Sequence, residues 1–458
     1  MKRTFFKTLA IAAALLSVGA YSNAALAAGT PTITKYLVTV PQKYFVNYQG
    51  PSEQSFPRGF LPGFGSAIAL KAINPDGSIE LYGITDRGPN GDGPKYQAGT
   101  EHYSSKFFPS PQFQPQIGII RIKDGKAEVT SVLGLKDEKG KAITGLPIEP
   151  GLIGATNEIA LDDCFKHLGY DNRGMDTEGI ALDAEGNFWV CDEYGPFIAQ
   201  YDKKGKLLKK YAPGQGLPAV MKYRTPNRGF EGLTITPAGL VYAAGQSPLD
   251  IEGKSGKTAQ FSRIVELDPK TGKTKMLAYP IDTEAYKAPK DAKIGDIYAV
   301  SDTRFLVIEQ GKGKDKQMRN LIYLVDIQDA TDLTGISIDG KEPEFTADKS
   351  KLAGIRFAKK QLLVDLRAHG WNTEKAEGLF LMPDQKTIVV TNDNDFGMAM
   401  AVEDATNGAT EPGDYTLQEN GAFSYEGKPA NPRMHIVANA PEERQQSIWF
   451  IELQEALY

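Results

Sequence analysis

Acidic residues recur next to glycine at the start of short apolar runs in this 458-residue chain. The clearest copies are Glu178-Gly179, Glu231-Gly232 and Glu377-Gly378, and Gly295-Asp296 is a looser fourth. In each copy a second apolar run follows, and it ends in carboxylate or amide residues such as Asp192-Glu193. Carboxylates brought together repel one another unless a cation lies among them. The repeated pattern therefore predicts a cation site.

The expected ligands of this cation all carry oxygen donors. They are Glu178, Glu231, Asp192 and Asp393, with further candidates at Asp86, Asp296, Glu309 and Asn392. Oxygen ligands select a hard cation, and many carboxylates suit Ca²⁺ better than Mg²⁺, so we expect Ca²⁺ or another divalent cation. The four histidines have no close ligand spacing, which argues against zinc. Alternatively, the acids cap turns and accept hydrogen bonds from backbone amides.

Three arginines accompany these acids. Arg87, Arg228 and Arg319 could bind the phosphate or carboxylate of a substrate through paired hydrogen bonds, or could simply pair with neighbouring acids. Glu193 or Glu377 could act as the base that takes a proton from water. A cation with carboxylates but without arginine contacts would instead suit a lactone or a sugar acid.

Short apolar runs separated by turn residues must position these groups. One unit comprises residues 178–182, 188–191, 197–201 and 207–211, and the same layout recurs, so that five unit openings are visible. Runs of four to six residues bounded by Gly, Asp and Pro are typical of antiparallel strands. A repeated four-stranded unit is a propeller blade. The long connections are expected insertions: 134–172, 340–372 with a helix at 361–366, and 398–432.

The sequence therefore predicts an all-β fold, a β-propeller of four-stranded antiparallel blades. We expect six blades, with five or seven as alternatives. Residues 33–40 and 447–453 are both strand-like, and joining them in one blade would close the ring without an exposed edge. In an antiparallel blade, the start of the first strand and the end of the second lie at the same edge. Since first strands line the central channel, the acids and arginines should meet at one end of it, the channel mouth.

Residues 1–27 are typical of a signal peptide. Basic residues at positions 2, 3 and 7 precede an apolar stretch too short to span a membrane, and Ala25-Leu26-Ala27 offers a cleavage site. No later stretch reaches the length of a membrane span, so we expect a periplasmic or secreted protein in which residues 28–458 form a single domain. The net charge of −5, without a stripe of Lys and Arg, argues against a nucleic-acid partner.

Cys164 and Cys191 are the only cysteines in the chain. In an oxidising compartment two cysteines tend to pair, so we expect a disulfide between them. The alternative is one buried free thiol and one thiol in a loop.

Several of these motifs resemble the phytase-like family described as having "esterase-like activity of phytase". They are Asp176–Ile180 with Asp192–Pro196, Asn227–Leu233, Asp86-Arg87-Gly88, Arg319 with Leu321–Tyr323, and Ala376–Gly378. The resemblance implies an exported β-propeller, distantly related to calcium-dependent propeller phytases and to lactonase-type propellers. The family often has Glu-Arg-Asp where this chain has Glu309-Gln310-Gly311. Without that arginine the resemblance does not imply a phosphate contact at this place, although Arg319 could compensate.

Together these observations favour an exported, metal-assisted hydrolase that acts on a small anionic ester, a phosphate ester or a related one, at the channel mouth. In this hypothesis the cation polarises the ester and activates water. One alternative is a non-catalytic propeller that binds a ligand or a protein and holds a structural cation. A further alternative is a lactonase-type hydrolase.

Overall fold

The computed structural model describes residues 30–404, 408–409 and 411–457, and within them the fold is all-β. The expected signal peptide at 1–27 lies outside the described residues. Single turns of 3₁₀ helix occur in the connections: η1 Gln42–Tyr44, η2 Glu53–Ser55, η3 Ala219–Tyr223, η4 Ile251–Gly253, η5 Pro289–Asp291, η6 Pro343–Phe345, η7 Arg367–His369, η8 Asp395–Gly397 and η9 Pro412–Asp414. Over the described ranges, no helix is long and apolar enough to cross a membrane.

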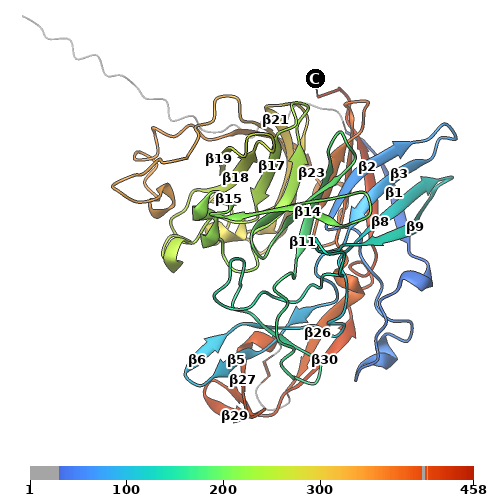
Figure 1. The fold of residues 1–458 in the computed structure, drawn as a ribbon, viewed down its shortest axis with the longest axis vertical. Coiled ribbons are helices and arrows are strands. Elements are labelled where there is room, and N and C mark those ends of the chain that lie inside the picture. Colours follow the sequence, from blue (N-terminus) through green and yellow to red (C-terminus); the bar gives the residue numbers. More distant parts are fainter. Residues whose placement is uncertain (1–29, 405–407, 410, 458) are drawn as a thin grey trace, which may run out of the picture.

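The described strands build five four-stranded antiparallel blades (Figure 1). Blade 1 is β2 (Ala67–Ile73), β3 (Ile79–Ile84), β8 (Gln116–Lys123) and β9 (Lys126–Gly134). Blade 2 is β11 (Thr177–Leu182), β12 (Phe188–Asp192), β13 (Phe197–Tyr201) and β14 (Leu207–Pro213), extended by β15 (Gly216–Leu217). Blade 3 is β16 (Phe230–Ile235), β17 (Val241–Gly245), β18 (Phe261–Leu267) and β19 (Thr274–Pro280). Blade 4 is β20 (Lys293–Ala299), β21 (Arg304–Lys312), β22 (Met318–Asp326) and β23 (Lys359–Asp365).

Blade 5 joins the two ends of the described chain. It consists of β24 (Gly378–Leu381), β25 (Thr387–Thr391), β31 (Ser447–Glu452) and β1 (Thr32–Thr39), in that order. The outermost strand, β1, pairs antiparallel with β31, as expected for ring closure. It also touches β9 of blade 1 at a short parallel ladder. The N-terminal strand therefore completes the fifth blade instead of opening a sixth.

The five first strands contact one another in a closed cycle, β2–β11–β16–β20–β24 and back to β2. Each interface between neighbouring blades holds one apolar cluster of the described chain. Blades 2 and 3, for example, share Trp189, Ile198, Leu233 and Val265. Burial of these faces supplies the main stabilisation of such a ring. The expected number of six blades is therefore not confirmed, and the described strands account for five.

A β-bulge accounts for two of the three Glu-Gly pairs. In β11 the ladder to β12 pairs Thr177 and Gly179 but skips Glu178, and in β16 it skips Glu231 in the same way. A bulge re-aims the extra residue, here toward the channel. The following glycine allows the next first strand to approach, because a Cβ at Gly232 would lie 2.6 Å from the amide nitrogen of Ile297.

Insertions between blade strands form an accessory layer beside the ring. Its strands form three small sheets: β10 (Ile159–Leu161) with β7 (Ser105–Phe107) and β4 (Gly91–Asp92); β26 (Met398–Glu403) with β30 (Arg433–Ala438); and β29 (Lys428–Ala430), β28 (Phe423–Tyr425), β27 (Tyr415–Gln418), β5 (Lys95–Ala98) and β6 (Glu101–Tyr103). Figure 1 shows them below the blades. The expected insertions at 134–172 and 398–432 contribute to this layer.

Two sequence predictions are wrong. Residues 361–366, expected to be helical, belong largely to β23, the outer strand of blade 4, whose residues pair with β22. The disulfide is also absent, because both cysteines are free. Cys191 is buried in β12, where its thiol faces the carbonyl of Phe230 at 3.6 Å, whereas Cys164 is exposed in the turn after β10.

Candidate functional site

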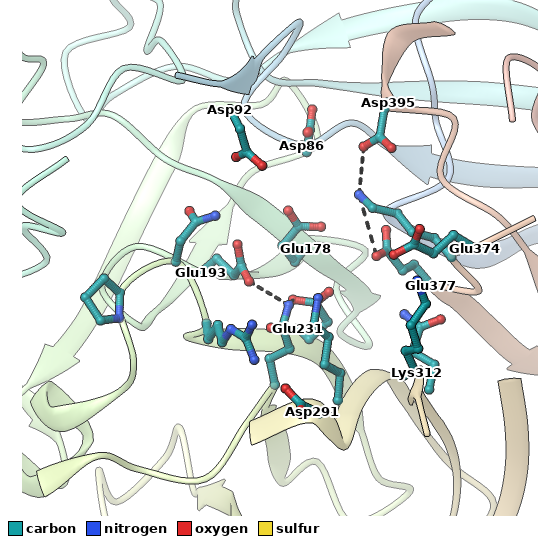
Figure 2. A pocket seen from close by; sticks show the side chains of 18 of the residues that line it. Asp86, Asp92, Glu178, Glu193, Glu231, Asp291, Lys312, Glu374, Glu377 and Asp395 are labelled. Carbon is teal, nitrogen blue, oxygen red and sulfur yellow. Dashed lines mark hydrogen bonds and ion pairs between the residues drawn. The ribbon is translucent and has the colours of Figure 1, made fainter. Parts of the chain in front are cut away.

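A cavity of about 1150 Å³ opens at the channel mouth. Its floor carries acids from the first strands, and its walls come from the accessory layer and from the loops of blades 3 and 4. Figure 2 shows Glu178 near the centre, with Asp86 and Asp92 on one side and Glu231 and Asp291 on the other. The acidic residues that line the cavity are Asp86, Asp92, Glu158, Glu178, Glu193, Glu231, Asp291, Glu374, Glu377 and Asp395.

Two groups of carboxylates on this floor share Glu178. The first contains Asp86, Asp176 and Glu178, and the second contains Glu178, Glu231 and Glu377. Within each group, one oxygen of every residue lies within 4.8 Å of the others. All five side chains are buried. The acids come from blades 1, 2, 3 and 5, so only the closed ring brings them together.

Burial dominates the electrostatics of the floor. It raises the pKa of Glu178 and of Glu231 well above the usual range, and neighbouring carboxylates raise both further. Burial also raises the pKa of Glu193 to about 8 and that of Glu377 to about 8. Without a cation, the floor therefore retains protons at neutral pH.

The donors and acceptors of the floor fit a hard cation. The amide nitrogen Nε2 of Gln246 donates to Glu193 Oε1 at 2.7 Å and to Glu231 Oε2 at 2.8 Å. The other amide atom, Gln246 Oε1, is buried without a hydrogen-bond donor, and so is Glu377 Oε2. Unpartnered buried oxygens beside clustered carboxylates match the oxygen ligands that Ca²⁺ takes in proteins.

Lys375 provides a positive charge within the site that the sequence reasoning missed. Its ammonium lies 2.9 Å from Asp393 Oδ2, 2.8 Å from Asp395 Oδ1 and 3.8 Å from Glu377 Oε1. Burial alone would lower the pKa of Lys375, but these carboxylates raise it well above its usual range. The available signal was its position two residues before Glu377, on the same approach to β24.

Some expected ligands are instead hydrogen-bonded to the protein framework. Asp192, whose pKa burial raises to about 7, accepts from the backbone amides of Asp176 and Gly195 at 2.7 and 2.6 Å. Asp393 pairs with Lys375. Asn392 accepts from the amide of Ser447 at 2.7 Å and belongs to the contact between β25 and β31. None of the three is among the cavity-lining residues.

Asp296 and Glu309 also lie outside the cavity, for different reasons. In β20 the bulge skips Gly295, so Asp296 occupies the position of the glycine in the Glu-Gly pairs. Its carboxylate accepts from the amides of Ile297 and Leu379, both at 2.7 Å. Glu309 accepts from the Tyr279 hydroxyl at 2.8 Å and pairs with Lys360.

The three arginines differ in their contacts. Arg87 is buried, with its guanidinium 3.3 Å from Asp176 Oδ2 and 3.4 Å from Glu158 Oε2. Arg228 lines the cavity and donates to the carbonyl of Lys290 at 2.5 Å. Arg319 pairs with Asp315 at 2.9 Å and does not line the cavity.

Asp176 was missed as a candidate ligand, although it lies only two residues before Glu178. Its carboxylate belongs to the first group, and its Oδ1 accepts from the backbone amide of Arg87 at 3.2 Å. The Asp-Thr-Glu-Gly order in this blade contained the signal, but the other blades have no acid at that position.

One protein-family model matches most of the chain. A family model described as "Phytase-like: Esterase-like activity of phytase" matches residues 62–396. An "Uncharacterized secreted protein" of Arthroderma benhamiae (strain ATCC MYA-4681 / CBS 112371) is 26% identical over 323 residues. That match covers 57% of this chain and 62% of the relative, so the two share less than two thirds of the relative's length.

Solved structures show only distant similarity. A protein from Lactobacillus plantarum is 12% identical, with a TM-score of 0.32 over 81% of this chain and 88% of that chain. A protein of unknown function from Dyadobacter fermentans DSM 18053 is 11% identical, with a TM-score of 0.34 over 92% and 99%. A streptogramin B lyase is 10% identical, with a TM-score of 0.26 over 84% and 98%.

Proposed function

We propose, since this chain belongs to the phytase-like family, that it is an exported, metal-assisted hydrolase of a phosphate ester or a related small ester. The reaction takes place in the cavity at the channel mouth, and the cation is Ca²⁺. The secreted description of the fungal relative supports export. The observation that carries the proposal is the pair of buried carboxylate groups that share Glu178. Such groups repel one another unless a cation is bound between them.

The geometry revises the expected ligand set. Glu178 and Glu231 remain in the set, and Asp86, Asp176 and Glu377 join them. Asp192 is left out because backbone amides hold its carboxylate, and Asp393 is left out because it pairs with Lys375. When bound, a divalent cation polarises the ester oxygen and lowers the pKa of water. Arg87 lines the cavity and pairs with Asp176 at 3.3 Å, so we assign it as the residue that positions Asp176.

Glu193 is the base in this proposal. It lines the cavity, and the Gln246 amide fixes one of its carboxylate oxygens at 2.7 Å. The other oxygen is left to accept a proton from the attacking water. Arg228 lines the same cavity and is assigned to the anionic group of the ester, because its fork can donate two hydrogen bonds to phosphate.

A substrate screen with and without chelator tests the proposal. Purified protein, first titrated with Ca²⁺ by calorimetry, is assayed on phosphomonoesters, phosphodiesters, carboxylate esters and lactones. We expect phosphate-ester turnover that EGTA abolishes and added Ca²⁺ restores. Turnover of lactones alone would support the lactonase-type alternative and contradict the phosphate assignment.

The non-catalytic alternative makes a different prediction in the same experiment. Lys375 already neutralises part of the acidic floor, so a cation there could serve stability alone. In that case EGTA would lower the melting temperature, and no ester in the screen would be turned over at any Ca²⁺ concentration.

A further inference from the structure

One side of the cavity carries lysines to which the proposed reaction assigns no role. They come from two segments: residues 285–293, which end at the first residue of β20, and residues 311–318, which run from the end of β21 to the start of β22. We call this the lysine wall, and its cavity-lining members are Lys287, Lys293, Lys312, Lys314 and Lys316. Figure 2 shows Lys312 and Asp291 on the side of the acidic floor away from Asp86 and Asp92.

The lysine wall is held together by its backbone. Tyr286 pairs with Gly313 in an antiparallel bridge, and the amide of Lys314 donates to the carbonyl of Ala285 at 2.9 Å. Gly311 has a φ of 148°, and a Cβ there would lie 1.9 Å from the carbonyl oxygen of Asp291. Only glycine permits this approach of the two segments, so the lysines project from a single preorganised surface.

Most of these lysines form no close ion pair among the described residues, although Lys293 lies near enough to the acidic floor to offset part of the rise in the pKa of Glu193 and of Glu377. Among the described residues, no carboxylate forms an ion pair with Lys287, Lys293, Lys312 or Lys316. Lys314 has one long contact, 3.7 Å to a Glu284 side chain that is 86% exposed. Asp315, within the hairpin, is paired with Arg319 at 2.9 Å and leaves the lysines unneutralised. Arg228 adds a further positive charge beside Lys290.

The cavity therefore has two zones of opposite charge. The acidic floor would hold the cation that engages the reacting ester, and the lysine wall faces the same space from one side. A single anionic group bound at the cation would leave the wall without a partner. The volume of about 1150 Å³ exceeds the roughly 300–1000 Å³ typical of small-ligand pockets. There is room for a substrate that reaches both zones.

We propose that the lysine wall is a second anion subsite, and that the substrate carries at least one further anionic group away from the bond that is cleaved. This inference rests on the proposed function, because the acidic floor must first supply the reacting centre. The wall then adds affinity and selectivity through charge, and leaves the chemical step to the floor.

A triple variant, Lys312→Gln, Lys314→Gln and Lys316→Gln, tests the subsite. All three side chains are exposed in one hairpin, so the substitutions should leave folding intact. The matched control is Lys203→Gln, Lys204→Gln and Lys206→Gln, which removes the same charge from an exposed turn of blade 2 that does not line the cavity. The probes are glycerol 2-phosphate, with one phosphate, and fructose 1,6-bisphosphate, with two.

We expect the wall variant to raise KM for the bisphosphate about tenfold, since exposed charge pairs are each worth roughly 0.2–1 kcal/mol. KM for the monophosphate and kcat for both substrates should change less than about twofold. The control variant should have the same KM values as the unmodified protein. In the unmodified protein, 0.5 M NaCl should reduce the preference for the bisphosphate over the monophosphate, because salt screens the charge of the wall. Equal effects on both substrates, or no effect on either, would overturn the subsite.

Calorimetry with the same two compounds and Ca²⁺ separates the subsite from the proposed function. If neither phosphate ester is turned over, the proposed function fails, yet tighter binding of the bisphosphate that the wall variant loses would still support the subsite. If the bisphosphate binds no more tightly than the monophosphate to the unmodified protein, the subsite is wrong whatever the turnover.

Discussion

The Glu178 carboxylate belongs to both groups on the floor, and among the described residues none donates a hydrogen bond to it. Burial and the carboxylates of Asp176 and Glu231 raise its pKa well above the usual range. A buried acid in this setting destabilises the folded protein when no cation is present. Stability alone therefore does not account for the bulge that places Glu178 in the channel. Binding of a cation by its carboxylate would account for it.

Replacing Glu178 with Gln should separate binding from stability. We expect Ca²⁺ affinity to fall more than about tenfold, because even changes around metal ligands cost that much, and hydrolysis should fall with it. The Ca²⁺-free variant should melt higher than the unmodified protein, since one buried acid is gone. Calorimetry and thermal melts in EGTA measure both effects, with Glu128→Gln on the exposed face of β9 as control. Unchanged Ca²⁺ affinity would remove Glu178 from the site.

At the scale of elements, a shift of one residue in strand register determines whether an acidic side chain faces the channel or bonds to a neighbouring strand. Glu178 and Glu231 occupy the bulged position and face the channel, whereas in β20 that position is Gly295. Asp296 comes one residue later and accepts the amide of Leu379, so it links the first strands of blades 4 and 5. An acidic side chain thus serves as a candidate ligand in blades 2 and 3 and as a connection between blades in blade 4.

Removing the Asp296 carboxylate should therefore affect stability and spare the site. Asp296→Ala leaves two buried backbone amides without their acceptor, and each such loss costs roughly 1–3 kcal/mol. We expect the free energy of unfolding in urea to fall by about 2–6 kcal/mol, with Ca²⁺ affinity of the folded variant within about twofold of the original. A large loss of Ca²⁺ affinity at unchanged stability would instead make Asp296 a ligand.

The sequence predicted features that depend on local pattern and missed those that depend on strand pairing. Apolar runs bounded by turns predicted the strands of blade 2 closely, because local pattern determines a strand. The Glu-Gly pairs predicted that Glu178, Glu231 and Glu377 converge. A bulge, however, depends on pairing with the neighbouring strand, so the roles of Gly295 and Asp296 were not visible. Lys375 was missed because its partners Asp393 and Asp395 follow β25, and only strand pairing brings them beside the residues that lead into β24. Asp176 was missed because its group includes Asp86, which comes from blade 1.

At the scale of the whole molecule, ring closure concentrates like charges. Five first strands converge on one channel, and the acids of four blades meet at its mouth. The N-terminal strand β1 completes the last blade, so the apolar interfaces between blades hold this arrangement from both ends of the described chain. The acidic floor and the apolar clusters oppose each other in free energy, and a bound cation would shift that balance.

The stability of the Ca²⁺-free protein should consequently fall as the pH rises. Glu377 and Glu193 have folded-state pKa values of about 8, against about 4.5 when unfolded, so the folded state holds protons that the unfolded state has lost. Stability from a raised pKa is present below the unfolded value and is lost as the pH rises through the folded one. We expect the melting temperature in EGTA to drop between pH 5.5 and about 8.5.

Saturating Ca²⁺ should reduce that drop, because ligand at about 100 times Kd adds about 2.7 kcal/mol. Glu377→Gln should flatten the EGTA curve, and Glu128→Gln should not. A melting temperature that is constant over this range in EGTA, or indifferent to Ca²⁺ at pH 8.5, would contradict a protonated acidic floor that a cation relieves.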